Sequence, residues 1–81
     1  MTVERKQVTI QKVEYTSSNK DANPQFRVET DRGTWLTEPG ASVARAIENS
    51  EYQGEVILTI RDGNIVGVCT LDGLTFAGVQ S

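Results

Sequence analysis

Apolar and polar residues alternate over much of this chain, a period of two that predicts β-strands. The clearest case is the stretch 54–70, where two runs rich in β-branched residues flank the pair Asp62-Gly63. An Asp-Gly pair in this setting predicts a β-hairpin. A two-residue loop would pair Ile60 with Ile65, whereas a three-residue loop would shift the register. Both registers bury a β-branched set, so the hairpin is predicted in either case.

The first strand-like stretch changes phase half-way along. Val8 and Ile10 fall on one face, whereas Val13 and Tyr15 have the opposite parity. A phase change inside one β-run predicts a bulge near residues 11–12, which would bend the strand. A long first strand that serves two neighbours or closes a barrel has this pattern. Two independent short strands are the alternative.

A second hairpin is predicted over residues 25–37, and its turn decides where the only tryptophan lies. A three-residue loop ending in Gly33 pairs Val28 with Leu36, which puts Leu36 in the core and Trp35 on the outer face. A two-residue loop shifts the register by one residue and turns Trp35 inward. The sequence leaves both registers open.

A short helix is predicted over residues 41–49, because Val43, Ala46 and Ile47 share a face at helical spacing. So short a helix is held only by packing, so we expect it to plug one end of a sheet or barrel. A second Asp-Gly pair at 72–73 predicts either a further small hairpin or a continued strand.

Three segments are expected to lie outside regular structure. The polar segment 17–24 predicts a loop, and loops of this kind often carry binding residues, with a plain connector as the alternative. The segments 1–6 and 79–81 are expected to be loose.

The residue types present limit the chemistry. The 81-residue chain has no histidine and one cysteine, which removes Ser-His and Cys-His pairs, ordinary zinc-site spacing and an intrachain disulfide. Cys69 lies in a predicted strand and is expected to be a small buried side chain. Gly67 in the same strand indicates a bend or the close approach of another element. We therefore expect no enzyme activity, no metal and no cofactor.

Charge is uneven along the chain. The net charge is −3; residues 1–32 carry six basic and five acidic side chains, and residues 33–81 carry two and six. An acidic balance disfavours non-specific binding to polyphosphate, so any nucleic acid would have to bind the first half. No run is long and apolar enough for a membrane helix, and the charged start predicts a cytoplasmic protein.

The predicted order is strand, strand, strand, short helix, strand, strand, with a bent first strand. Over residues 7–70 this order resembles the OB-fold, a small Greek-key barrel. It also looks like small OB-type proteins of phage and bacteria, in which a Gly-x-Val strand, here from Gly54, follows the helix. The resemblance implies one mainly β domain over 1–81, an antiparallel barrel of five or six strands with one short helix between strands 3 and 4.

The resemblance also implies where a ligand would bind. OB-folds typically bind on the outer face of strands 2 and 3, framed by the first and last loops between strands. Carried to this chain by position, that site comprises Arg27, Glu29, Trp35, Thr37, Asn19, Lys20 and Arg61. An aromatic ring beside an arginine is what stacking of single-stranded bases requires.

Two functions follow as hypotheses. One is a protein-interaction or accessory module of phage type, whose exposed Trp35 would anchor the interface. The other is a domain that binds single-stranded nucleic acid. An enzyme or metal protein is the remaining alternative. Homo-oligomers formed through edge strands are a plausible assembly in so small a sheet.

Overall fold

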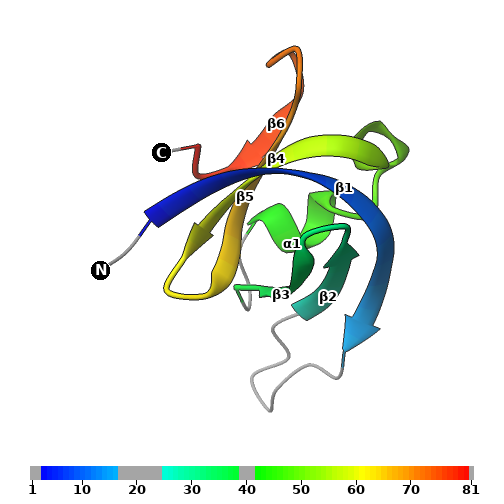
Figure 1. Cartoon of the computed structure of the whole chain (residues 1–81), viewed down its shortest axis with the longest axis vertical. Helices are drawn as coiled ribbons and strands as arrows, with labels where there is room; N and C mark the ends of the chain where they lie inside the picture. The colour runs from blue at the N-terminus through cyan, green and yellow to red at the C-terminus, as the bar shows by residue number, and fades with distance from the viewer. Residues whose placement is uncertain (1–2, 17–24, 39–41, 81) are drawn as a thin grey trace.

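The computed structural model describes residues 3–16, 25–38 and 42–80. Its elements in chain order are β1 (Val3–Thr16), β2 (Gln25–Thr30), β3 (Gly33–Thr37), α1 (Ser42–Ala46), the 3-10 turn η1 (Ser50–Tyr52), β4 (Gly54–Arg61), β5 (Asn64–Thr70) and β6 (Phe76–Gly78). The strands curve around one interior, and β1 forms a long bend (Figure 1). The predicted mainly β architecture with a short helix between β3 and β4 is confirmed.

β1 is one long bent strand with two partners. It pairs antiparallel with β4 through residues 3–10 and with β2 through residues 10–16. The register against β2 shifts between Ile10 and Lys12, which confirms the predicted bulge, and the alternative of two independent strands is wrong. The expected fraying of 1–6 is also wrong for Val3 to Lys6, which are paired with β4; residues 1–2 lie outside the described part.

The sheet closes on itself. Its order is β3-β2-β1-β4-β5-β6, and every neighbouring pair in that order is antiparallel. β3 also pairs in parallel with β5, with Leu36 opposite Asn64 and Thr37 opposite Ile65. The Glu38 N–H extends this contact by donating to the Ile65 carbonyl at 2.9 Å. The ring β1-β2-β3-β5-β4 is thereby completed, and β6 lies beside β5 outside it.

Inward-facing side chains from every strand of the ring fill the interior. The fully buried apolar side chains of the strands are Val8, Val28, Val56, Leu58, Ile65 and Val68, and the helical segment adds Val43 and Ile47. α1 contributes to this core and contacts β5 and β6. The helix is therefore held by packing against the core, as predicted for so short a helix.

α1 is shorter than the predicted helix over 41–49. The described helix ends at Ala46, where the Asn49 N–H donates to the Ala46 carbonyl at 2.9 Å. That three-residue spacing tightens the last turn and stops the α-helix. The fully buried alanine is Ala44, while Ala46 is only half-buried. Residue 41 lies outside the described part.

The β4–β5 turn uses two residues. Asp62 and Gly63 have φ values of 53° and 87°, the left-handed pair that a tight hairpin turn requires. Ile60 therefore lies opposite Ile65, as the two-residue alternative predicted. The register then shifts between Thr59 and Ile60, so the remainder of β5 follows neither predicted register.

The second Asp-Gly pair, at 72–73, forms a further small hairpin between β5 and β6 and does not continue the preceding strand. β6 pairs with β5 so that Cys69 faces Phe76 and Gly67 faces Gly78. Cys69 is buried, as predicted. The expected looseness of the end is wrong for Val79 and Gln80, because the Val79 N–H donates to the Val66 carbonyl at 2.9 Å and the Gln80 amide donates to three backbone carbonyls.

Candidate protein-binding surface

The β2–β3 register turns Trp35 toward the core. Val28 pairs with Trp35 and Arg27 pairs with Leu36, so neither predicted pairing is observed. Trp35 is half-buried and packs against the core cluster, whereas Leu36 is exposed on the outer face. The three-residue register, with an outward Trp35 and a core Leu36, is therefore wrong. The inward Trp35 of the two-residue alternative is observed, although the two turn residues are Asp31 and Arg32, and the ring lies on the other side of the sheet from Arg27.

The turn that sets this register is held by long-range contacts. Thr30 pairs with Gly33, which leaves Asp31 and Arg32 as the turn. Asp31 is fixed to β1, since its Oδ1 accepts the Thr9 N–H at 2.8 Å and its own N–H donates to the Thr9 carbonyl at 3.1 Å. The hydroxyl of Thr30 also donates to the Gly33 carbonyl at 2.8 Å. These bonds make Gly33 the first residue of β3 instead of the last residue of the loop.

Gly33 also makes room for the tryptophan ring. A Cβ at this position would lie 3.2 Å from the ring carbon Cη2 of Trp35. The φ of Gly33 is 143°, a value that side-chain-bearing residues rarely adopt. The ring therefore covers Gly33 and packs against the core cluster.

The remaining predicted site residues separate into three locations. Thr37 is fully buried, and its hydroxyl accepts the Phe26 N–H at 3.0 Å. Arg61 ends β4 and pairs with Glu38, whose Oε2 is 3.2 Å from Nη2. Glu29 is half-buried on the outer face, opposite Thr34. Residues 19 and 20, the predicted Asn19 and Lys20, lie outside the described residues.

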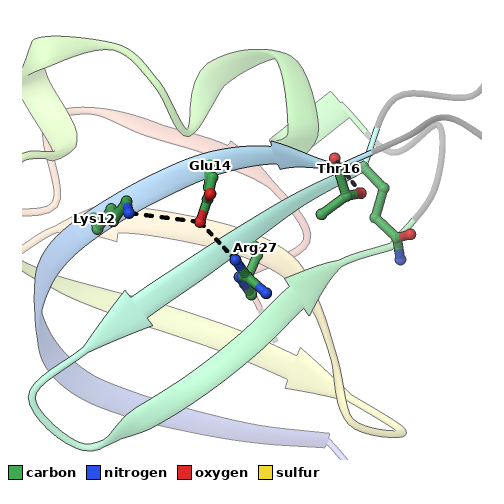
Figure 2. Close-up of polar contacts among 5 residues, drawn as sticks. Lys12, Glu14, Thr16 and Arg27 are labelled. Carbon is green, nitrogen blue, oxygen red and sulfur yellow. Dashed lines mark hydrogen bonds and ion pairs between the residues drawn. The ribbon is translucent and has the colours of Figure 1, made fainter.

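The outer face of β1 and β2 carries a matched set of charges (Figure 2). Nη2 of Arg27 is 2.6 Å from Oε2 of Glu14, and Nζ of Lys12 is 3.7 Å from the same oxygen. The hydrogen bond from Arg27, with the nearby positive charge of Lys12, holds the pKa of Glu14 below its usual range. The same hydrogen bond raises the pKa of Arg27. Glu29, opposite Lys12 on the same face, supplies a second carboxylate, so the two acidic side chains offset the two cations and this face has little net charge to offer a phosphate backbone.

The β5–β6 turn, residues 71–75 between the two strands, differs from this charged face because its exposed side chains are apolar. Three large apolar side chains stand in solvent there: Leu74 is 82% exposed, Phe76 61% and Leu71 48%. The turn projects away from the barrel body at one end of the molecule (Figure 1). Burying side chains of this size against a partner is favourable by about 1.5–3 kcal/mol each.

Hydrogen bonds fix the shape of this turn. Oδ1 of Asp72 accepts the Thr70 hydroxyl at 2.6 Å and the Leu74 N–H at 2.9 Å. These bonds, the hydroxyl first, lower the pKa of Asp72. The Thr70 N–H donates to the Thr75 carbonyl at 2.9 Å, and the Gly73 N–H donates to the Thr70 carbonyl at 2.9 Å. The apolar side chains are therefore held on a preorganised turn, which lowers the entropy lost on binding.

Close backbone contact attaches the hairpin to the barrel. A Cβ on Gly67 would lie 1.6 Å from the Val79 carbonyl oxygen, and one on Gly78 would lie 2.3 Å from the Val66 carbonyl oxygen. The predicted close approach at Gly67 is thus confirmed. On the same face of the sheet, the register places Phe76 beside buried Cys69 and half-buried Ile57 of β4. Of these three side chains, only Phe76 is exposed.

Sequence reasoning did not select Leu71, Leu74 and Phe76. The signal that could have identified them is the run Leu-Asp-Gly-Leu-Thr-Phe at 71–76. Large apolar residues on both sides of a tight turn exceed what two short strands can bury, so part of that set must face solvent.

Other kinds of site find little support in the described residues. Within 3–16, 25–38 and 42–80, no group of three or more His, Cys, Asp or Glu side chains could hold a metal ion. No helix of the described chain has the length and apolar character needed to cross a bilayer. Comparison with protein-family models, curated proteins and solved structures found no match.

Proposed function

We propose that this protein is a non-catalytic protein-binding module of OB type that docks through its β5–β6 turn. The OB assignment is supported by the ring β1-β2-β3-β5-β4, by the parallel β3–β5 contact that completes it, and by the helix between β3 and β4. The resemblance inferred from element order over residues 7–70 predicts this arrangement.

The observation that carries the proposed function is the exposure of Leu74 and Phe76 on a turn with a fixed shape. Rigid apolar anchors surrounded by polar surface are typical of interface centres. The alternative, stacking of single-stranded bases, requires an exposed ring beside unpaired cations. On the described outer face of β2 and β3 there is no aromatic side chain, and Arg27 is already paired with Glu14.

A comparative capture experiment tests the proposal. Wild-type protein, the Leu74→Asp variant and a matched control are immobilised and exposed to lysate of the source organism. Val3→Asp is the control, because Val3 is also an exposed apolar residue but lies on β1. We expect at least one protein to be retained by wild type and by Val3→Asp, and depleted at least tenfold on Leu74→Asp. Equal retention on all three would contradict the proposal.

A second experiment tests the alternative that the protein binds single-stranded nucleic acid. We expect fluorescence anisotropy of labelled poly-dT at low salt to remain unchanged at micromolar protein, because the cations of the outer face are paired. Binding that weakens in Arg27→Ala, but not in Leu74→Asp, would favour the nucleic-acid hypothesis and overturn the proposed use of the turn.

A further inference from the structure

The second half of β1 has a partner on only one of its edges. β1 pairs with β4 up to Ile10, which lies opposite Gly54, and its residues 12–16 pair with β2. Among the residues that the structure describes, no strand pairs with the other edge of this second half. A strand edge without a neighbour exposes backbone N–H and carbonyl groups that can bind another chain.

The β2–β3 hairpin shows in which direction the backbone groups of β2 point. Its two-residue turn follows the pair Thr30–Gly33, and such a hairpin closes on a pair that exchanges both backbone hydrogen bonds. The direction alternates along a strand, so the backbone groups of Phe26 also point to β3, where its N–H donates to the Thr37 hydroxyl at 3.0 Å. Those of Arg27, the next residue, therefore point to β1.

This direction identifies the residues that face the open edge of β1. Arg27 lies opposite Glu14, so the backbone groups of Glu14 point to β2. Those of its neighbours, Val13 and Tyr15, point to the opposite edge. None of the turn and loop backbone hydrogen bonds among the described residues involves Val13 or Tyr15. Tyr15 is exposed and Val13 is half-buried, so an incoming chain can reach this edge.

An open cleft of about 320 Å³ lies between this edge and the chain that follows α1. The residues that line it are Ile10, Gln11, Lys12, Val13, Ile47, Glu48 and Gln53. Ile10 and Ile47 are buried, so the cleft offers little apolar surface for a large side chain to cover. Gln11 and Gln53 are exposed, and their side-chain amides can contact a chain that lies in the cleft.

The chemistry of the cleft matches an uncharged ligand that has amide groups. Lys12 lies 3.7 Å from the carboxylate of Glu14, and Glu48 adds a further carboxylate, so the rim has no excess positive charge. What the cleft offers instead is the backbone of Val13 and Tyr15 and two side-chain amides, groups that both donate and accept hydrogen bonds. A polypeptide backbone in an extended conformation has the same donors and acceptors.

We propose that the open edge of β1 at Val13 and Tyr15 binds an extended, uncharged segment of a partner protein as an added strand. The side chains of an added strand alternate between two faces. On one face they would meet Val13 and the ring of Tyr15, whose centroid lies 5.3 Å from that of Phe26. On the other face they would meet the polar outer side chains of β1. The segment that fits therefore alternates apolar residues with uncharged polar ones.

Amide hydrogen exchange of the free protein, followed by NMR, tests whether the edge is open. We expect the N–H groups of Val13 and Tyr15 to exchange at least about tenfold faster than that of Glu14, after correction for intrinsic rates, because only the Glu14 N–H points to β2. Equal protection of the three groups would mean that the edge is already covered, and would overturn the proposal.

Titration with the peptide acetyl-Thr-Val-Thr-Val-Thr-amide tests binding. The peptide is uncharged, alternates apolar and polar side chains and favours strands, and recognition through the backbone requires no further sequence. At millimolar peptide we expect amide shift changes confined to residues 10–16 and 47–53, and exchange at Val13 and Tyr15 slowed at least about fivefold. The same peptide methylated on every backbone nitrogen is the control and should cause neither change.

Three results of this titration would overturn the inference. They are no change with the first peptide, equal changes with both peptides, and changes confined to the β5–β6 turn. Changes at residues 10–16 that grow with protein concentration alone, without peptide, would identify a second copy as the occupant and so overturn the choice of a partner protein.

Proline variants separate the two edges of β1. Tyr15→Pro removes an N–H from the open edge, where proline is tolerated, so it should unfold at nearly the same urea concentration as Tyr15→Ala. Tyr15→Ala keeps the N–H and should bind the peptide at least about threefold more tightly than Tyr15→Pro. Glu14→Pro removes an N–H that points to β2 and should unfold at clearly lower urea. Equal destabilisation by the two prolines would mean that the edge at Tyr15 is not open.

The inference goes beyond the proposed function and can fail separately from it. Leu74→Asp changes the β5–β6 turn and leaves β1 as it is, so this variant should bind the peptide as wild type does. Peptide binding that is lost in Leu74→Asp would assign the peptide to the turn and overturn the proposed strand addition. Peptide binding that persists while Leu74→Asp still captures every protein that wild type captures would overturn only the proposed use of the turn.

Discussion

The outer face of β1 and β2 and the β5–β6 turn are both exposed, but they differ in what their side chains already contact. On the outer face, Arg27 and Lys12 share the carboxylate of Glu14. At the turn, the polar groups are bonded within the turn, while Leu74 and Phe76 stand in solvent. The first surface has its charges satisfied internally, and the second leaves apolar area exposed to solvent.

This difference shows why residue type alone is a weak guide to a site. An arginine near a tryptophan suggests stacking, but the register puts Trp35 inside and gives Arg27 a carboxylate partner. A leucine in a turn is easily passed over, yet Leu74 has the greatest exposure of the large apolar side chains described. Whether a side chain is already satisfied within the fold decides what it can offer a partner.

The largest expected effect tests whether the turn is rigidly attached. Gly67→Ala places a Cβ against the Val79 carbonyl oxygen, where the backbone itself must move. We expect a loss of about 3 kcal/mol in the free energy of unfolding, measured by urea denaturation. Gly73→Ala is the control, because Gly73 has a φ of 76° but no atom within 4 Å. It should cost only about 1 kcal/mol of backbone strain. Equal costs would mean that the hairpin is not held close to β5.

The second prediction concerns the core side of β2 and β3, where Trp35 packs inward. Val28 is fully buried opposite Trp35, so Val28→Ala should cost about 2 kcal/mol in unfolding free energy through lost burial and the cavity left behind. The emission of Trp35 should also shift to longer wavelength as water reaches the ring. Thr34→Ala on the exposed outer face should change stability by no more than about 0.5 kcal/mol. An emission maximum like that of free indole in the wild type would contradict the inward orientation of Trp35.

Local patterns predicted the barrel well. The parity change between Ile10 and Val13 located the bulge, because a half-buried strand must keep its apolar side chains inward. Asp62-Gly63 located a hairpin, because few residue pairs adopt two left-handed conformations. In both cases the feature is determined by the conformations and side chains of a few neighbouring residues.

The β2–β3 register could not be predicted in this way. It is fixed by hydrogen bonds between Asp31 and Thr9 of β1, two residues far apart in the sequence. No local pattern shows that bond, and a one-residue slip sends every side chain of β3 to the other face. The predicted site therefore depends on the register: the three-residue loop places Trp35 outside, whereas the observed pairing turns it inward. The apolar turn is identified by the exposure of its side chains.

A smaller expected effect is the pH dependence of the two surfaces, each of which contains a carboxylate held by hydrogen bonds. Hydrogen bonds lower the pKa of both Glu14 and Asp72, so each carboxylate stabilises the fold above its unfolded pKa. That contribution is lost as pH falls below about 4 and through the lowered folded pKa. We expect acid to release the Leu74 amide from Asp72 and speed its hydrogen exchange severalfold relative to neighbouring β5 amides, after correction for intrinsic rates. Asp72→Ala should remove this pH dependence while leaving that of the outer face intact.

The smallest expected effect is the change in stability caused by Leu74→Asp. Because Leu74 is 82% exposed, the substitution should change the free energy of unfolding by no more than about 0.5 kcal/mol in either direction. Thermal and urea unfolding of the dilute monomer would measure this. A loss above about 1 kcal/mol would mean that Leu74 packs within the monomer, and any loss of binding would then reflect a damaged fold. Unchanged stability together with lost association would assign the effect to the surface of the turn, since both surfaces tolerate a charge but only the apolar one needs a partner.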